Sequence, residues 1–240
     1  MVKRGERGRC VTGIEGLDNI LGGGIPLSNI VLVAGGCGTG KTTLAMEFLV
    51  RGSLKGESGL LISTVENSDK LVSNIPQFTF FNEKMLVKGQ VWITELEQVM
   101  ESANLSPSKM DEAAVKKLVM AIGKMIQSSK VKRLVIDSID TILVEIKDEA
   151  LNALLLSELS TILYRNECTA ILITGEETCK TIEGRVADGI IVMGNYDRRG
   201  DLLRTMQVGK MKGTSHSRSK YVIDLTPAGV LVTPMLKGGS

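Results

Sequence analysis

The stretch GGCGTGKT at residues 35–42 decides the fold class, because it meets the GxxxxGK[ST] pattern of a phosphate-binding loop (P-loop) at every required position. Residues 29–35 (NIVLVAG) are an apolar run with β-branched side chains and predict a buried strand. Residues 41–54 predict a helix. A strand before the loop and a helix after it are the context that the motif requires, so the sequence predicts a P-loop fold that binds ATP.

The residue types in this loop fit the chemistry of a triphosphate. Glycines allow backbone N–H groups to curl around phosphates, and the helix N-terminus adds partial positive charge. We expect Lys41 to reach the β- and γ-phosphates and the Thr42 hydroxyl to ligate Mg²⁺. Cys37 either fills a variable position of the motif or is a redox-sensitive thiol. The predicted nucleotide-binding residues are Gly36, Cys37, Gly38, Thr39, Gly40, Lys41, Thr42 and Thr43.

A phosphoryl-transfer site also needs a carboxylate that holds Mg²⁺ at the end of a neighbouring strand. Residues 134–137 (LVID) give three apolar residues followed by Asp137, and this pattern predicts the second metal-binding residue beside Thr42. Asp140 is the competing carboxylate. It lies beyond the predicted strand, where we expect it to cap the next turn.

Strands and helices alternate along most of the chain. Further strands are predicted at residues 59–64, 91–95, 133–137 and 169–174, with helices after Ser106-Pro107 and along residues 151–162. Short strand-like runs close the chain at residues 189–193, 203–209, 221–225 and 230–233, and residues 77–90 are expected to be a mobile loop. The pattern predicts an α/β fold over a single domain, residues 1–240, with a mostly parallel twisted sheet, helices on both faces and an antiparallel extension near the C-terminus.

Composition narrows the function classes. The 29 basic and 27 acidic residues give a net charge of +2, which offers no global argument for nucleic acid or an anionic membrane. The four cysteines (Cys10, Cys37, Cys168, Cys179) show no CxxC spacing, so neither a zinc site nor a disulfide framework is indicated. The sequence has no signal-peptide pattern and no apolar run near the ~20 residues of a membrane span. We therefore expect a cytoplasmic protein.

Several stretches together resemble the KaiC family of RecA-superfamily ATPases, in its single-domain archaeal form. They are residues 12–18 (TGIEGLD), 21–26 (LGGGIP), the P-loop, 136–138 (IDS) and 210–216 (KMKGTSH). The resemblance implies a RecA-like fold, ATP and Mg²⁺ bound at subunit interfaces, and a homo-oligomeric ring, a hexamer in the family. A regulatory or assembly ATPase with a protein partner in signalling fits this resemblance.

The resemblance implies catalytic residues, with a departure after the second strand. The family usually carries a Glu-Glu pair there, and its first member is the expected base for the attacking water. This chain has Val65 and Glu66 at that point. Two readings follow. Either Glu66 acts as the base beside Lys41, or the chain is an ATP-sensing binding module with negligible turnover.

The resemblance also implies contacts in trans, from one subunit to its neighbour's nucleotide, by Lys210, Lys212 and His216. The family has arginine at the second of these positions, whereas Lys212 lacks the bidentate fork of arginine. The autokinase acceptor positions hold Gly184 and Arg185, so autophosphorylation there is not expected.

A basic stretch at residues 198–220 allows an alternative. It carries seven basic residues and one acidic residue, Asp201, with Asp197 just before it, and this charge pattern is compatible with a trans nucleotide contact, a solvated face or a nucleic-acid patch. Single-strand binding usually adds aromatic platforms, and only Tyr196 and Tyr221 are nearby. A DNA-repair paralogue is therefore the least favoured hypothesis.

Overall fold

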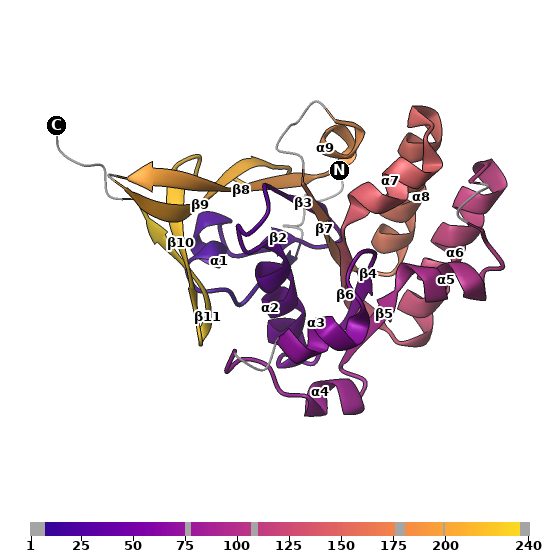
Figure 1. Cartoon of the computed structure of the whole chain (residues 1–240), viewed down its shortest axis with the longest axis horizontal. Coiled ribbons are helices and arrows are strands. Elements are labelled where there is room, and N and C mark those ends of the chain that lie inside the picture. Colours follow the sequence, from indigo (N-terminus) through magenta and orange to yellow (C-terminus); the bar gives the residue numbers. More distant parts are fainter. Residues whose placement is uncertain (1–7, 75–77, 107–109, 176–180, 199, 236–240) are drawn as a thin grey trace, which may run out of the picture.

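The computed structural model describes residues 8–74, 78–106, 110–175, 181–198 and 200–235, and within them the chain builds a nine-stranded sheet (Figure 1). The strand order is β11-β10-β9-β8-β3-β7-β6-β4-β5. Six strands from β5 to β8 run parallel, and β9, β10 and β11 continue the sheet in antiparallel fashion. The bounds are β3 (Ile30–Ala34), β4 (Ser58–Ser63), β5 (Val91–Glu95), β6 (Val131–Asp137), β7 (Thr169–Thr174), β8 (Gly189–Arg198), β9 (Asp201–Met211), β10 (Lys220–Thr226) and β11 (Gly229–Pro234).

Helices cover both faces of the parallel part, as the sequence predicts. Alternate residues of each strand point to opposite faces, so Val31 and Val33 join one apolar cluster while Ile30 and Leu32 join the other. The first cluster contains α1 (Leu17–Ile20) and α2 (Lys41–Ser53). The second contains α5 (Leu96–Ser102), α6 (Glu112–Ser128), α7 (Ile139–Ile146) and α8 (Glu149–Arg165). Burial on both faces explains why these strands read as continuous apolar runs.

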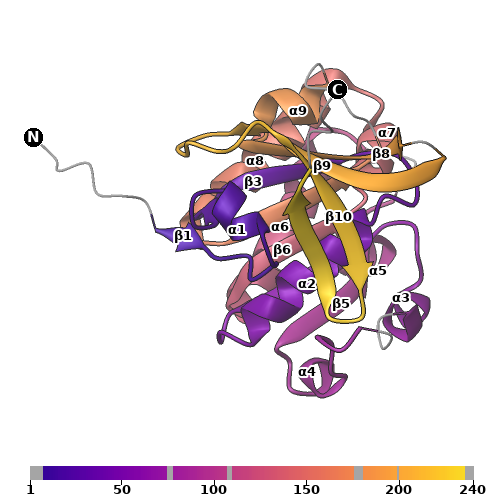
Figure 2. The same ribbon diagram turned by 90° about the vertical axis from the view of Figure 1, so that its left-hand side faces the viewer.

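The antiparallel extension curls over α2 (Figure 2). The amide of Val230 on β11 donates to the Glu47 carboxylate of α2 at 2.6 Å, and Arg51 pairs with the same carboxylate at 2.9 Å. Burial raises the pKa of Glu47, although the Val230 amide and the Arg51 guanidinium oppose the shift. The contact fixes the C-terminal strands against the helix that begins in the P-loop.

Two expectations about helices and loops are wrong. The helix expected to start at Ser106-Pro107 begins instead at Glu112, because Asp111 caps it by accepting a hydrogen bond from the Ala114 amide at 2.9 Å. Pro107 lies outside the described residues. The segment 77–90 is expected to be a mobile loop. Its described part, from residue 78, contains the helix α4 (Lys84–Val87), and Phe80, Phe81 and Met85 pack into the core.

Short elements complete the described chain. They are β1 (Arg9–Cys10), β2 (Ile25–Pro26), α3 (Ser68–Asn74) and α9 (Ile182–Val186). β1 and β2 pair with each other in a separate two-stranded sheet. Among the described residues, no helix has the length and apolar character needed to cross a membrane.

Candidate functional site

The P-loop and the other predicted site residues meet at one edge of the sheet. The parallel register places Ser63 beside Asp137, Asp137 beside Ile173, and Ala34 beside Thr174. The carboxyl ends of β3, β4, β6 and β7 therefore lie together, and this is the edge at which open α/β sheets bind ligands. The P-loop leaves β3 here and leads directly into α2.

The P-loop backbone has a shape that requires glycine. Gly35 has a φ of 153°, and a Cβ on it would lie 2.0 Å from the Met193 carbonyl oxygen. Gly38 and Gly40 also have positive φ, at 74° and 95°. The buried Thr39 hydroxyl donates to the Gly36 carbonyl at 2.9 Å. These features fix a tight loop at the N-terminus of α2, which is a favourable place for an anion.

Two cationic side chains contact the P-loop. The Lys41 ammonium donates to the carbonyls of Gly35 and Gly36 at 2.6 Å and 2.8 Å. Arg204 on β9 donates through Nε to the Gly38 carbonyl at 3.1 Å. Sequence reasoning placed Arg204 only in the basic C-terminal stretch. The contact arises because β9 pairs with β8, whose residue Met193 lies against Gly35.

Thr42 and Asp137 are brought together, as the motif spacing predicted. The Thr42 hydroxyl donates to Asp137 Oδ2 at 2.7 Å. Burial raises the pKa of Asp137, and the Thr42 hydrogen bond and the Lys41 charge act against that rise. A hydroxyl and a carboxylate are hard oxygen ligands, and Mg²⁺ in nucleotide sites takes one or two carboxylates together with waters and phosphates. The residues present therefore fit a magnesium ion.

Glu66 lies at the same edge, beyond the end of β4. Burial is the main cause of the raised pKa of Asp137, and the negative charge of Glu66 adds to that rise. The Glu66 side chain is 35% exposed and forms a loose ion pair with Lys70 at 3.8 Å. Val65, the residue before Glu66, is 80% exposed. Glu66 is thus the acidic residue of this segment, and it follows the carboxyl end of β4, which pairs with β6 at Asp137.

Asp140 does not cap a turn, contrary to expectation. Its carboxylate accepts hydrogen bonds from the Thr174 hydroxyl at 2.6 Å and the Gly175 amide at 2.7 Å. It therefore ties the start of α7 to the end of β7. Thr64 has a similar role at β4, since its hydroxyl accepts from the Ser138 amide at 2.8 Å. Sequence reasoning missed both contacts because each joins residues that are far apart along the chain.

The cysteines divide into two groups. Cys37 is exposed in the P-loop, whereas Cys10 and Cys168 are buried. Burial raises the pKa of Cys10 to about 11 and that of Cys168 to about 12, which makes both thiols poor nucleophiles. Cys179 lies outside the described residues.

Lys210 and Lys212 lie at the opposite end of the sheet from the P-loop. Lys210 donates to the Ala187 carbonyl at 2.6 Å, and Lys212 pairs with Asp188 at 3.0 Å. Met211 of β9, which lies between the two lysines in the sequence, pairs with Gly189 at the start of β8. Gly189 in turn pairs with Val31 near the start of β3. Four residues of strand, about 13 Å, separate Val31 from the P-loop. These lysines therefore cannot reach the nucleotide site of their own chain.

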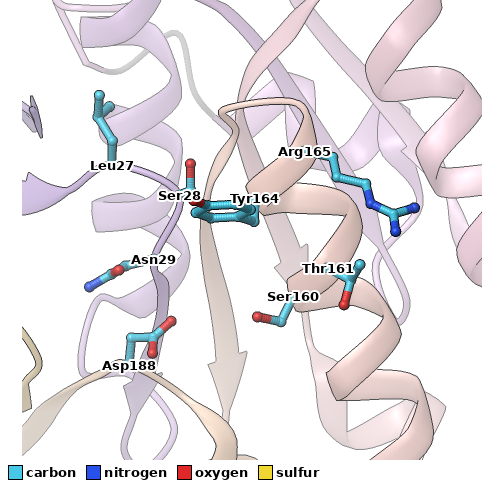
Figure 3. A pocket seen from close by; sticks show the side chains of 8 residues that line it. All are labelled: Leu27, Ser28, Asn29, Ser160, Thr161, Tyr164, Arg165 and Asp188. Carbon is cyan, nitrogen blue, oxygen red and sulfur yellow. The ribbon is translucent and has the colours of Figure 1, made fainter. Parts of the chain in front are cut away.

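A pocket of about 340 Å³ opens at this same end of the sheet (Figure 3). Figure 3 shows Asn29 and Asp188 on one side and Ser160 and Tyr164 of α8 on the other. Its remaining lining residues are Leu27, Ser28, Thr161 and Arg165. The hollow adjoins the Lys212–Asp188 ion pair.

His216 follows in the same loop as Lys212. Both ring nitrogens of His216 are buried and have no hydrogen-bond partner among the described residues. In the isolated chain the imidazole is therefore unsatisfied, which costs free energy.

Known proteins resemble this chain over nearly its whole length. A family model described as "ATPase: KaiC" matches residues 10–237. The UPF0273 protein PH0284 of Pyrococcus horikoshii is 31% identical, with 96% of this chain and 97% of that protein covered. The circadian clock oscillator protein KaiC of Parathermosynechococcus lividus is 28% identical, covering 93% of this chain and 42% of its own length. Among solved structures, the KaiC-like protein PH0186 of Pyrococcus horikoshii OT3 superposes with a TM-score of 0.79 at 31% identity, over 95% of this chain and 99% of that one.

Proposed function

The chain belongs to the KaiC family of ATPases, and from this premise we propose that it binds Mg·ATP at the P-loop and hydrolyses it as one domain of a homo-oligomeric ring. The observation that carries the proposal is the 2.7 Å contact between Thr42 and Asp137. It joins the P-loop helix to the neighbouring strand end in the arrangement that phosphoryl transfer uses.

Each residue at the P-loop edge has a role in this proposal. Lys41 exchanges its carbonyl partners for the β- and γ-phosphates, while loop amides hold the phosphate oxygens. Thr42 and Asp137 hold Mg²⁺, which, when bound, neutralises charge on the phosphates. Glu66 orients the attacking water and accepts its proton. Release of Lys41 from Gly35 and Gly36 is then a local rearrangement that the nucleotide itself drives.

The positions of Lys210 and Lys212 support a head-to-tail assembly. The P-loop occupies one end of the sheet and the two lysines the other, so one copy presents its lysines to the nucleotide of the next. Such heterologous contacts close into rings when the rotation permits. We propose a hexamer on the family resemblance. The nucleotide then bridges two chains, so ATP favours the ring over the free subunit.

A second candidate function is ATP sensing without significant turnover. The half-buried Glu66 and its ion pair with Lys70 favour it, because a base engaged by a lysine is less available to water. A nucleic-acid function has less support. Lys210 and Lys212 are both engaged by oxygens of their own chain, at Ala187 and Asp188.

Lys212→Ala is expected to lower ATP turnover and ATP-dependent assembly together, while free subunits still bind ATP. Removing one group that stabilises charge in the transition state typically costs ~10²-fold or more in rate. The measurements are phosphate release and light-scattering mass, with and without Mg·ATP. Lys220→Ala, which removes an exposed cation from the same basic stretch, is the matched control and should behave like the parent.

Mixing makes this test decisive. Lys212→Ala subunits supply intact P-loops and Lys41→Ala subunits supply intact Lys212, so part of the activity should return in mixed rings. If the proteins co-assemble and nothing returns, Lys212 does not act in trans. A selective loss of DNA affinity in Lys212→Ala would instead favour the nucleic-acid function.

Incubation with γ-labelled ATP is expected to leave the segment around α9 unlabelled, since the acceptor positions hold Gly184 and Arg185. The Thr181 hydroxyl caps α9 by accepting from the Gly184 amide at 3.3 Å. Thr178 lies outside the described residues. Mass spectrometry of the incubated protein checks this, and phosphate on Thr178 or Thr181 would contradict it.

A further inference from the structure

We propose that Arg9 is a positioning residue for the loop that presents Lys212 to the neighbouring subunit. This loop, residues 212–217 (KGTSHS), is called the interface loop below. The inference rests on the trans role of Lys212 proposed above. It assigns a function to the N-terminal strand β1, which pairs with β2 shortly before the start of β3.

The two ends of the interface loop are fixed by backbone hydrogen bonds. At one end, the Lys212 amide donates to the Asp188 carbonyl at 2.8 Å. At the other, the Ser217 amide donates to the Ile20 carbonyl at 3.2 Å. The four residues between them lie outside the strands, so contacts with the rest of the chain help to fix their position.

Arg9 makes that contact. Its Nη1 atom donates to the Thr214 hydroxyl, in the middle of the loop, and to the carbonyls of Leu21 at 3.2 Å and Gly24 at 3.0 Å. The Thr214 hydroxyl in turn lies 3.5 Å from the Leu21 carbonyl, to which it donates. One guanidinium nitrogen thereby joins the interface loop to the glycine-rich turn at residues 21–24. A charged donor makes these bonds stronger than neutral ones.

The glycine-rich turn is shaped to allow this contact. Gly24 has a φ of 116°, and a Cβ on it would lie 2.5 Å from the Cys10 carbonyl oxygen. The turn therefore packs directly on β1, next to Arg9. A Cβ on Gly22 would lie 3.6 Å from the Ser215 carbonyl, so the turn also borders the interface loop itself. Arg9 of β1 therefore links two stretches that are far apart in sequence, residues 21–24 (LGGG) and 212–217 (KGTSHS).

His216 does not supply an anchor to the rest of the chain, and the Ser217 hydroxyl bonds only nearby, accepting from the Tyr221 hydroxyl at 2.8 Å. Both ring nitrogens of His216 lack a partner among the described residues. The Lys212 ammonium forms an ion pair with Asp188, which lies outside the loop. To bind a phosphate, the ammonium must break this ion pair or bind the carboxylate and the phosphate together. Arg9 thus holds the middle of the loop, at Thr214, while Lys212 at the end of the loop is held by Asp188 and exchanges that carboxylate for the neighbour's phosphate.

Arg9→Ala is expected to reproduce Lys212→Ala. A displacement of about 1 Å of a group that positions a substrate can cost ~10²-fold in rate, so we expect turnover to fall by roughly 10- to 10²-fold. Free subunits should bind Mg·ATP with the parent's affinity, because Arg9 lies away from the P-loop. Arg9→Lys, which keeps a cationic donor on a shorter stem, should retain more turnover than Arg9→Ala. The control Lys132→Ala removes a surface cation that also bonds a carbonyl, that of Asn166, and should match the parent.

Subunit mixing separates this role from a merely structural one. Arg9→Ala mixed with Lys41→Ala should recover activity, since the second protein supplies an intact interface loop to the first protein's P-loop. Failure to recover, while the Lys212→Ala mixture does recover, would overturn the role of Arg9 and leave the trans lysine standing. Failure of both mixtures would reject the trans site itself, and this inference with it.

If Arg9→Ala does not fold, Thr214→Val provides the same test. It removes the loop's acceptor and leaves Arg9 with its two carbonyl partners. The same loss of turnover with recovery on mixing supports the inference, and parent-level turnover in Thr214→Val contradicts it.

Discussion

Lys41→Ala is expected to weaken Mg·ATP binding by ~10²-fold or more, because truncating one partner of a hydrogen-bonded charge pair costs about 2–5 kcal/mol and each 1.4 kcal/mol is tenfold in affinity. Lys41 is the P-loop's own cation, and in the described structure its ammonium is bonded only to the carbonyls of Gly35 and Gly36. It therefore reaches a phosphate without breaking an ion pair. Isothermal titration calorimetry with Mg·ATP measures the effect.

Two control variants sharpen this experiment. Lys55→Ala removes an exposed lysine just beyond the other end of α2 and should bind ATP like the parent. Arg204→Ala removes the second cation on the loop, which contacts the Gly38 carbonyl through Nε. If Lys41→Ala binds Mg·ATP as tightly as the parent protein, the P-loop is not the nucleotide site. This conclusion does not depend on the affinity of Arg204→Ala.

Glu66→Gln is expected to lower ATP turnover by ~10²-fold, the scale of a lost general base, with ATP binding intact. The substitution keeps the size of the side chain and removes its proton-accepting carboxylate. Since the Glu66 charge raises the pKa of Asp137, its removal lowers that pKa and leaves Asp137 fully able to hold Mg²⁺. The expected signature is a fall in kcat with little change in the affinity for Mg·ATP.

Asp69→Asn is the matched control for Glu66→Gln. It removes the same charge from the exposed first turn of α3 and should leave turnover unchanged. Unchanged turnover in Glu66→Gln would reject the catalytic role. Together with intact binding and assembly, that result would favour an ATP sensor over a hydrolase.

Most of the parallel sheet could be predicted because its strands are buried on both faces. β3, β4, β6 and β7 read as continuous apolar runs, and the structure places strands at these positions. The antiparallel strands were predicted too short. The hairpin between β8 and β9 ends in residues such as Tyr196 and Leu202, which are 44% and 69% exposed. Because these ends are not buried against the core, burial does not set their limits, which follow from the pairing of β8 with β9.

The P-loop, its strand and helix, and the partnership of Thr42 with Asp137 could all be predicted from the order of residues along the chain. These follow from local order, because parallel neighbouring strands bring their carboxyl ends to one edge and the two motifs each sit at such an end. The family resemblance predicted that Lys210 and Lys212 contact a nucleotide in trans, but it did not predict their position in the fold. The fold shows them at the opposite end of the sheet, out of reach of their own P-loop.

The contacts between distant segments could not be predicted from the sequence and are seen only in the folded chain. Arg204 reaches Gly38, Asp140 holds Thr174, and Arg9 bonds Thr214, although none of these pairs shares a local pattern. Each contact depends on strand order and register, which are set by the packing of the whole core and not by the spacing of residues along the chain. A sequence motif predicts the local structure of its own segment, whereas contacts with distant segments form only when the strands pair into the sheet.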